Sequence, residues 1–262
     1  MQMTPEHIEQ LHRAKRLLEN PGLSAKITNF IGKPIEKGIE LLPDKWSEVV
    51  NNATKKSLVT ALDAALMTFG ENGQLESRDI WHKIAATASG ACGGAFGLPA
   101  LVIELPVSTT IMLRSIADIA RSEGEDIRLV ESKLACLEVF ALGGRTSKAD
   151  AAESGYFAIR AALAKVVSEA AEFIAERGLA KEGAPIIVRL ISQIATRFGV
   201  NVSEKAAAQA IPAVGAVGGA LVNLTFIDHF QDMARGHFTV RRLERIYGTE
   251  VVQSEYRKLN SQ

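Results

Sequence analysis

The sequence predicts an all-α protein: a compact multi-helix bundle with two central helical segments that are rich in Gly and Ala and interrupted by proline. Apolar residues recur at helical spacing along the whole chain, and no segment shows sustained period-two alternation. Helix start and stop residues bound these apolar runs. Aromatic residues make up only 6% of the chain, which favours helices in close contact over sheets filled by large side chains.

Six helices are predicted in the first half of the chain. Pro5 and Pro99 stand where a first-turn proline is tolerated, whereas Pro34 and Pro106 lie inside helices and bend them. The run Asn20-Pro21-Gly22 ends the first helix. In chain order the helices span about 5–20, 25–40, 44–69, 77 into the first uncharged stretch, 99–124 and 127–142.

The second half follows a polar loop from 143 to 155. It contains a long helix ending at Gly178, a shorter helix from Pro185 to Phe198, the second uncharged stretch, and a basic C-terminal helix around Arg241 to Arg245. Every predicted helix is longer than its polar connections, which favours one domain over residues 1–262.

Two pseudo-halves, about 1–142 and 156–262, are an alternative organisation within that domain. Asp118-Ile119-Ala120-Arg121 follows the first uncharged stretch, and Asp232-Met233-Ala234-Arg235 follows the second. Chance or shared helix chemistry explains this short echo about as well as duplication does.

The two stretches Ile84 to Ile103 and Ala206 to Ile227 carry no charged residue. They reach the length of a membrane span, but their small residues and prolines make them poor anchors. Pairs of their glycines stand four apart, on one helical face, where two backbones can approach closely. We interpret both as closely packed inner helices; reversible contact with lipid and stable spanning are the alternatives. The close-packing glycines are Gly90, Gly93, Gly94, Gly97, Gly215, Gly218 and Gly219.

Composition argues against several partners. Thirty basic and thirty acidic residues give a formal net charge of zero, so there is no global field to hold nucleic acid. Cys92 and Cys136 lie in apolar helical patterns typical of free, buried thiols in a reducing compartment. The first residues are charged, with neither a secretory signal nor a lipidation motif. We therefore expect a cytoplasmic protein without nucleic acid, metal or cofactor.

Polar residues inside the uncharged regions are the sharpest site candidates. Glu104 lies between Pro99 and Pro106 among apolar residues, so its carboxylate needs a cation, a hydrogen-bond donor or a ligand. Arg114 or a donor on another helix are the internal partners we expect. Asn223 lies in the second stretch, where another buried group has to satisfy its amide.

A second cluster of candidates follows Asn223 on the same predicted helix. Asp228 and Asp232 share a face, and Asp232 stands three residues before Arg235, so the segment can bring acid, imidazole and guanidinium groups together. Structural ion pairing is the interpretation that we favour; catalysis and metal binding are the alternatives. His229 and His237 stand eight apart, which matches no standard helical metal-ligand spacing.

Familiar catalytic motifs are absent. The sequence has no His-Glu-x-x-His, no Gly-x-Ser-x-Gly, no phosphate-binding Gly-x-x-x-x-Gly-Lys-Ser/Thr and no Cys-x-x-Cys. An enzyme would have to be a hydrolase, or another enzyme, with Glu104, Asp228, His229 and Asp232 in one cleft.

Several short motifs together resemble the EcsC family. They are Gly93-Gly94-Ala95-Phe96-Gly97-Leu98-Pro99, Glu104-Leu105-Pro106, the run from Pro212 to Asn223, His237-Phe238-Thr239-Val240-Arg241-Arg242-Leu243-Glu244, and Tyr247-Gly248. The resemblance extends from about the second helix to Gly248. It implies a family named after an operon with an ABC transporter, and it supplies no catalytic residues. Some members are labelled peptidases, but the missing zinc-protease motif argues against that label here.

The leading hypothesis is a non-enzymatic, cytoplasmic protein that associates reversibly with the inner membrane and binds lipid or an apolar ligand through its small-residue helices. The family context suggests an ABC transporter or a secretion system as a partner. The alternatives are the hydrolase described above and a structural protein-interaction module, for which the first two helices would offer exposed amphipathic faces.

Overall fold

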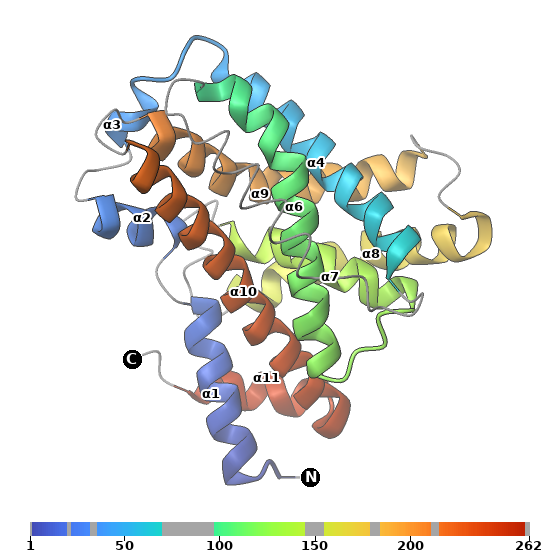
Figure 1. Cartoon of the computed structure of the whole chain (residues 1–262). Helices are drawn as coiled ribbons and strands as arrows, with labels where there is room; N and C mark the ends of the chain where they lie inside the picture. Colours follow the sequence, from blue (N-terminus) through green and yellow to red (C-terminus); the bar gives the residue numbers. More distant parts are fainter. Residues whose placement is uncertain are drawn as a thin grey trace.

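The computed structural model describes residues 2–19, 22–31, 36–69, 97–144, 155–178, 184–210 and 215–259. All regular structure in these ranges is α-helical, which confirms the predicted bundle (Figure 1). The helices are α1 (Pro5–Glu19), α2 (Leu23–Ile31), α3 (Glu36–Ile39), α4 (Trp46–Thr68), α6 (Gly97–Ser122), α7 (Val130–Gly143), α8 (Gly155–Arg177), α9 (Pro185–Ala210), α10 (Gly215–Tyr247) and α11 (Thr249–Lys258).

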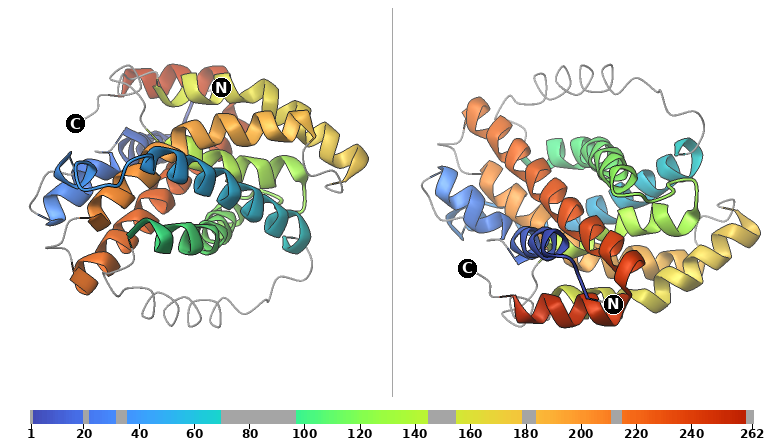
Figure 2. Two further views of the ribbon diagram at one scale, coloured as in Figure 1. Left: turned by 90° about the horizontal axis from the view of Figure 1, so that it is seen from above. Right: turned by 90° about the horizontal axis from the view of Figure 1, so that it is seen from below.

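Helix α7 occupies the centre of the bundle. It contacts α4, α6, α8, α9 and α10, and Figure 2 shows these helices around it. Every residue from Ser132 to Gly143 is buried. A helix enclosed on all sides has no solvent-facing stripe, so its polar groups have to find partners inside the protein.

Four phenylalanine rings form the aromatic part of the core beside α7. Phe140 of α7 lies 4.8 Å from Phe198 of α9 and 5.3 Å from Phe230 of α10, measured between ring centroids. Phe226, one turn before Phe230, adds a fourth ring at 5.2 Å from it. Tilted and edge-to-face contacts of this kind stabilise a core beyond the area they bury, and here they join three helices.

Helices α6 and α10 run side by side in the same direction. Gln231 donates a hydrogen bond to the Ser115 hydroxyl at 2.9 Å, and two turns further along Thr239 donates to the Glu123 carboxylate at 3.2 Å. Both pairs are separated by 116 positions in the chain, so the two helices keep a constant register. The starts of α6 and α10 consequently lie at the same end of the bundle (Figure 1).

The N-terminal helix α1 packs against α10 and α11. Leu11 and Leu18 are buried, and the Lys15 ammonium donates to the backbone carbonyls of Tyr256 and Leu259 at 3.1 and 2.6 Å. In α2, Leu23 and Ile27 are buried as well. The interaction-module alternative assigns exposed amphipathic faces to the first two predicted helices; these four apolar residues face the bundle, whereas Ile39, in the second predicted helix, is 42% exposed.

Two predicted helix boundaries were wrong. Helix α9 does not stop at Phe198 but continues through Gly199 to Ala210, because burial of Val202, Ala206 and Ala207 outweighs the low helix propensity of glycine. The predicted basic C-terminal helix is the end of the 33-residue α10. The predicted helix at 25–40 is described in two parts, α2 and α3, and residues 32–35 between them lie outside the described residues. Helix α11 was not predicted.

The uncharged stretches are described only in part. The first enters the structure at Gly97 as the start of α6, and the second is divided between the end of α9 and the start of α10. The predictions for Gly90, Gly93 and Gly94 lie outside the described residues, as do the surroundings of Gly97, Gly215, Gly218 and Gly219. Across the described helices, none combines the length and apolarity needed to cross a membrane.

Close backbone approach occurs at glycines that the sequence analysis did not select. A Cβ atom at Gly236 of α10 would lie 2.7 Å from Leu18 Cγ and 3.0 Å from the carbonyl oxygen of Ala14, both in α1. A Cβ at Gly38 would lie 2.0 Å from the carbonyl oxygen of Ala207. At these positions the absence of a side chain lets a second helix reach van der Waals distance.

Substitution of Gly236 by alanine is expected to destabilise the protein, whereas the same change at Gly199 stabilises it. Both glycines lie inside helices, and a Cβ at Gly199 meets nothing within 4 Å. Gly199→Ala should raise the free energy of unfolding by about 0.5–1 kcal/mol through helix propensity. Gly236→Ala should lower it by about 1–3 kcal/mol through overpacking. Urea-induced unfolding followed by circular dichroism measures both; a gain at Gly236 would contradict the close α1–α10 contact.

Candidate functional site

Glu104, the first predicted site residue, forms an ion pair with Lys205. Both carboxylate oxygens lie 2.9 Å from the Lys205 ammonium, so α6 is bonded to α9. The ammonium also lies 4.9 Å from the centroid of the Phe226 ring in α10. The expectation of a donor on another helix is confirmed, and the donor is Lys205 where Arg114 had been the named candidate.

Asn223 of α10 lies one turn before Phe226, and its side chain is partly buried. Its Oδ1 atom is enclosed and has no hydrogen-bond partner among the described residues. The expectation that a buried group satisfies this oxygen was therefore wrong. An enclosed amide oxygen without a donor is unfavourable. This turn of α10 therefore contains a polar group whose hydrogen-bonding capacity is not satisfied.

The residues from Asp228 to Arg235 make contacts to different partners. Asp232 pairs with Arg235 at 3.2 Å, as predicted, and with Lys26 of α2 at 3.1 Å. His229 is buried and its Nε2 lies 3.0 Å from the carbonyl oxygen of Gly143 at the end of α7. Asp228 is exposed. These contacts are structural: they attach α10 to α2 and to α7. In the described ranges no three His, Cys, Asp or Glu side chains are grouped as a metal site.

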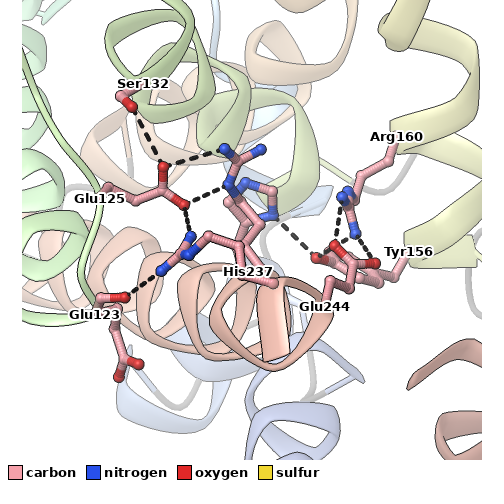
Figure 3. A network of polar contacts seen from close by, with 9 residues as sticks. Glu123, Glu125, Ser132, Tyr156, Arg160, His237 and Glu244 are labelled. Atoms are coloured by element: carbon pink, nitrogen blue, oxygen red, sulfur yellow. Dashed lines mark hydrogen bonds and ion pairs between the residues drawn. The ribbon is translucent and has the colours of Figure 1, made fainter. Parts of the chain in front are cut away.

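The largest polar cluster lies on the second half of α10, where His237, Arg241, Glu244 and Arg245 fall on successive turns. Figure 3 shows this stripe with Glu125 on one side and Tyr156 with Arg160 on the other. Residues at spacings of three and four share one face of a helix. The stripe therefore faces both the turn before α7 and the start of α8.

Glu125 is the centre of the first part of the cluster. Its buried carboxylate accepts hydrogen bonds from Arg241 at 2.8 and 3.1 Å, from Arg245, and from the Ser132 hydroxyl at 3.3 Å. Burial by itself would raise the pKa of Glu125, but hydrogen bonds and charge from the two arginines lower that pKa below its ordinary value of 4.5. The two arginines therefore stabilise the ionised form of the Glu125 carboxylate.

The second part of the cluster joins Arg160, Tyr156 and His237. Arg160 binds both Glu244 oxygens at 2.9 Å and donates to the Tyr156 hydroxyl at 3.3 Å. The Tyr156 oxygen lies 3.0 Å from His237 Nδ1. The Tyr156 oxygen accepts a hydrogen bond from Arg160, and its own proton can be donated to Nδ1 when the His237 proton is on Nε2.

His237 is fully buried, and its Nε2 has no hydrogen-bond partner among the described residues. Burial, followed by the charges of Arg160 and Arg241, lowers the pKa of His237 well below 6.5. Burial also raises the pKa of the Tyr156 hydroxyl. Both groups are neutral at physiological pH, so the hydrogen-bonded pair adds no charge to the interior.

Glu138 of α7 is the unusual member of this region. It is only 6% exposed, and no described residue donates a hydrogen bond to it. Burial raises its pKa to about 7, although the charges of Arg160 and Arg241 act in the opposite direction. Both arginines already bind another carboxylate. Glu138 consequently changes its protonation state near neutral pH inside the protein.

Sequence analysis selected His237 but not the rest of this cluster. Its sequence signal is the polar spacing His237-x-x-x-Arg241-x-x-Glu244-Arg245 on an otherwise apolar helix. The partner Glu125 comes from the connection before α7, Glu138 from α7, and Tyr156 and Arg160 from α8. Only the tertiary packing brings them to α10, and no local pattern identifies them.

Fold and site together define the class of the protein: an all-α bundle with a buried central helix and a charged network on one long helix. The chain belongs to the EcsC protein family, whose model matches residues 5–243. The matched range begins with α1 and ends within α10, so it includes the Glu104–Lys205 pair and, of the polar stripe, His237 and Arg241. No curated protein and no solved structure matches the chain.

Replacement of Glu138 by glutamine should stabilise the protein increasingly as the pH rises. Folding raises the pKa of Glu138 from 4.5 to about 7. Ionisation of Glu138 therefore destabilises the folded protein progressively as the pH rises from 4.5 to 7, and by the full amount above pH 7. The gain of Glu138→Gln over the wild type should therefore grow between pH 5 and pH 8 by on the order of 3 kcal/mol.

Urea unfolding of both proteins across this pH range gives the difference between their free energies of unfolding. The opposing contribution of His237 cancels in this difference, because both proteins contain His237. Glu131→Gln, at an exposed position on the same helix, is the control and should show no comparable growth. A difference between Glu138→Gln and wild type that stays constant with pH would show that Glu138 does not titrate in this range.

Proposed function

We propose that this protein is a non-enzymatic, cytoplasmic protein that associates reversibly with a lipid surface, peripherally at the inner membrane. The observation that carries the proposal is the exposed apolar face on the first turns of α6. Ile103 is 76% exposed and Val107, one turn later, is 50% exposed. Residues four apart lie on the same side of a helix, so these two side chains form one outward-facing patch.

Helix α10 extends the exposed apolar surface at the same end of the bundle. Leu224 is 53% exposed. The offset of 116 positions that pairs Gln231 with Ser115 places Leu224 level with residue 108, which directly follows Val107 in α6. The side chains of Ile103, Val107 and Leu224 thus lie at a similar height along the two parallel helices.

A lipid surface is the occupant that fits the adjoining sequence. Ile103 is the last residue of the first uncharged stretch, and Leu224 lies within the second. A chain segment without charges can enter the interface of a bilayer without desolvating an ion. A protein partner would be expected to supply charge complementarity, and these stretches have no charge to complement.

The number of exposed side chains agrees with reversible attachment. Transfer of one large aliphatic side chain out of water is worth roughly 1.5–2 kcal/mol, so three contribute about 5 kcal/mol. This amount is comparable to the marginal binding that a single myristoyl chain provides. While attached to the lipid surface, the protein would bind an apolar ligand or a partner such as an ABC transporter or a secretion system. The transporter is suggested by the operon after which the family is named.

Purified protein is expected to sediment with phospholipid vesicles, and Ile103→Ser/Val107→Ser should lower the vesicle partition coefficient at least about tenfold because it removes two inserting side chains. Leu129→Ser is the matched control. Leu129 is 53% exposed but follows the other end of α6, so its substitution should leave binding unchanged. Wild-type protein that stays in the supernatant with both zwitterionic and anionic vesicles would refute the proposal.

A further inference from the structure

Glu104 and Lys205 are the charged residues at the edges of the two uncharged stretches. Glu104 directly follows Ile84–Ile103, and Lys205 directly precedes Ala206–Ile227. Their ion pair, with both distances at 2.9 Å, therefore joins the end of one stretch to the beginning of the other. The pair brings together two chain positions separated by 101 residues.

The environment of the pair makes it a strong restraint. Lys205 is 1% exposed, whereas Glu104 is 21% exposed. A buried ammonium needs a partner, because loss of the carboxylate would leave it as an uncompensated charge. The ring of Phe226, which belongs to the second stretch, provides a further favourable contact with the Lys205 cation. Lys205 thus attaches to α6 and α10 at once.

The first turns of α6 depend on this tertiary contact more than an ordinary helix start does. Pro106 has no N–H, so the carbonyl of Val102 lacks its intrahelical donor. The hydroxyl groups of Ser108 and Thr110 donate to the carbonyls of Leu105 and Pro106, so neither of them donates to the carbonyl of Val102. The turn that carries Ile103 and Glu104 is consequently joined to the rest of α6 by a weakened backbone ladder.

We propose that the Glu104–Lys205 ion pair restrains the first turns of α6 against α9, and that its opening raises the affinity of the protein for a lipid surface. This inference rests on the proposed lipid association and adds its regulation. While the pair is closed, the first turns of α6, from Gly97 to Ile103, are held against α9. When it opens, these turns can move with Ile103 into the bilayer interface, with the partly exposed Glu104 left on the water side.

Lys205→Met is the variant that tests the inference, since methionine keeps the apolar contact with Phe226 and leaves Glu104 accessible to water. Its partition coefficient on phosphatidylcholine vesicles should rise about tenfold, because the open form is no longer a minor population. The charge-exchanged variant Glu104→Lys/Lys205→Glu should restore the pair and lower the partition coefficient toward the wild-type value. Glu104→Gln serves as a second single variant should Lys205→Met not fold.

Arg160→Met is the matched control for general destabilisation. It breaks an ion pair with the same contact distances, 2.9 Å from each of two guanidinium nitrogens to Glu244, that joins α8 to α10. Its urea midpoint should fall while its vesicle binding stays at the wild-type level. Equal increases in binding for Lys205→Met and Arg160→Met would overturn the inference, because binding would then report only on loosened packing.

The outcomes separate this inference from the proposed function. Wild-type binding together with unchanged binding of the folded single variants overturns the role of the pair and leaves lipid association standing. Failure of the charge-exchanged variant to reduce the increased binding also counts against the pair. Absence of binding in the wild type and in every variant removes the proposed function, and the inference with it.

Discussion

The rest of the structure depends on the burial of α7 from Ser132 to Gly143. Because no face of this part of the helix meets water, its surroundings supply partners for its polar groups: Asn201 and His229 bond to the carbonyl of Gly143, and Ser132 bonds to Glu125. Lys133 points its ammonium toward the carbonyl of Leu66, and burial lowers its pKa. These contacts fix where α4, α9 and α10 can lie, since a change in their position would leave a buried polar group without a partner.

Helix α10 meets this constraint along most of its length. Phe226 and Phe230 fill the aromatic core, His229 caps α7, and the polar stripe from His237 to Arg245 binds both the turn before α7 and the start of α8. Glu138 is the exception within this arrangement. Its raised pKa follows from its burial, which outweighs the opposing charges of Arg160 and Arg241, and each of these arginines is bound to another carboxylate. The interior charge of the protein therefore depends on pH near neutrality.

The two ends of the bundle differ in chemical character. The end around Tyr247, α11 and α1 is held by charged and hydrogen-bonded side chains, such as Lys15 with the carbonyls of Tyr256 and Leu259. At the opposite end, where α6 and α10 begin, apolar side chains face water and the Glu104–Lys205 pair is the charged contact between α6 and α9. The start of α6 thus combines exposed apolar side chains with an ion pair that restrains it, and this combination is what connects the fold to the proposed lipid association.

The sequence by itself determined the helical class, most helix starts, the buried position of Cys136, the i,i+3 pairing of Asp232 with Arg235, and membership of the EcsC family, because these follow from local spacing or from motifs. Lys205 as the partner of Glu104, the unsatisfied Asn223, and the cluster around Glu125, Glu138 and Tyr156 were decided only by the tertiary structure. The physical reason is that a buried charge is satisfied by whichever segment packs against it, and that neighbour lies more than a hundred residues away in the chain. The predicted helix end at Phe198 was wrong because burial of the residues that follow outweighed the low helix propensity of Gly199.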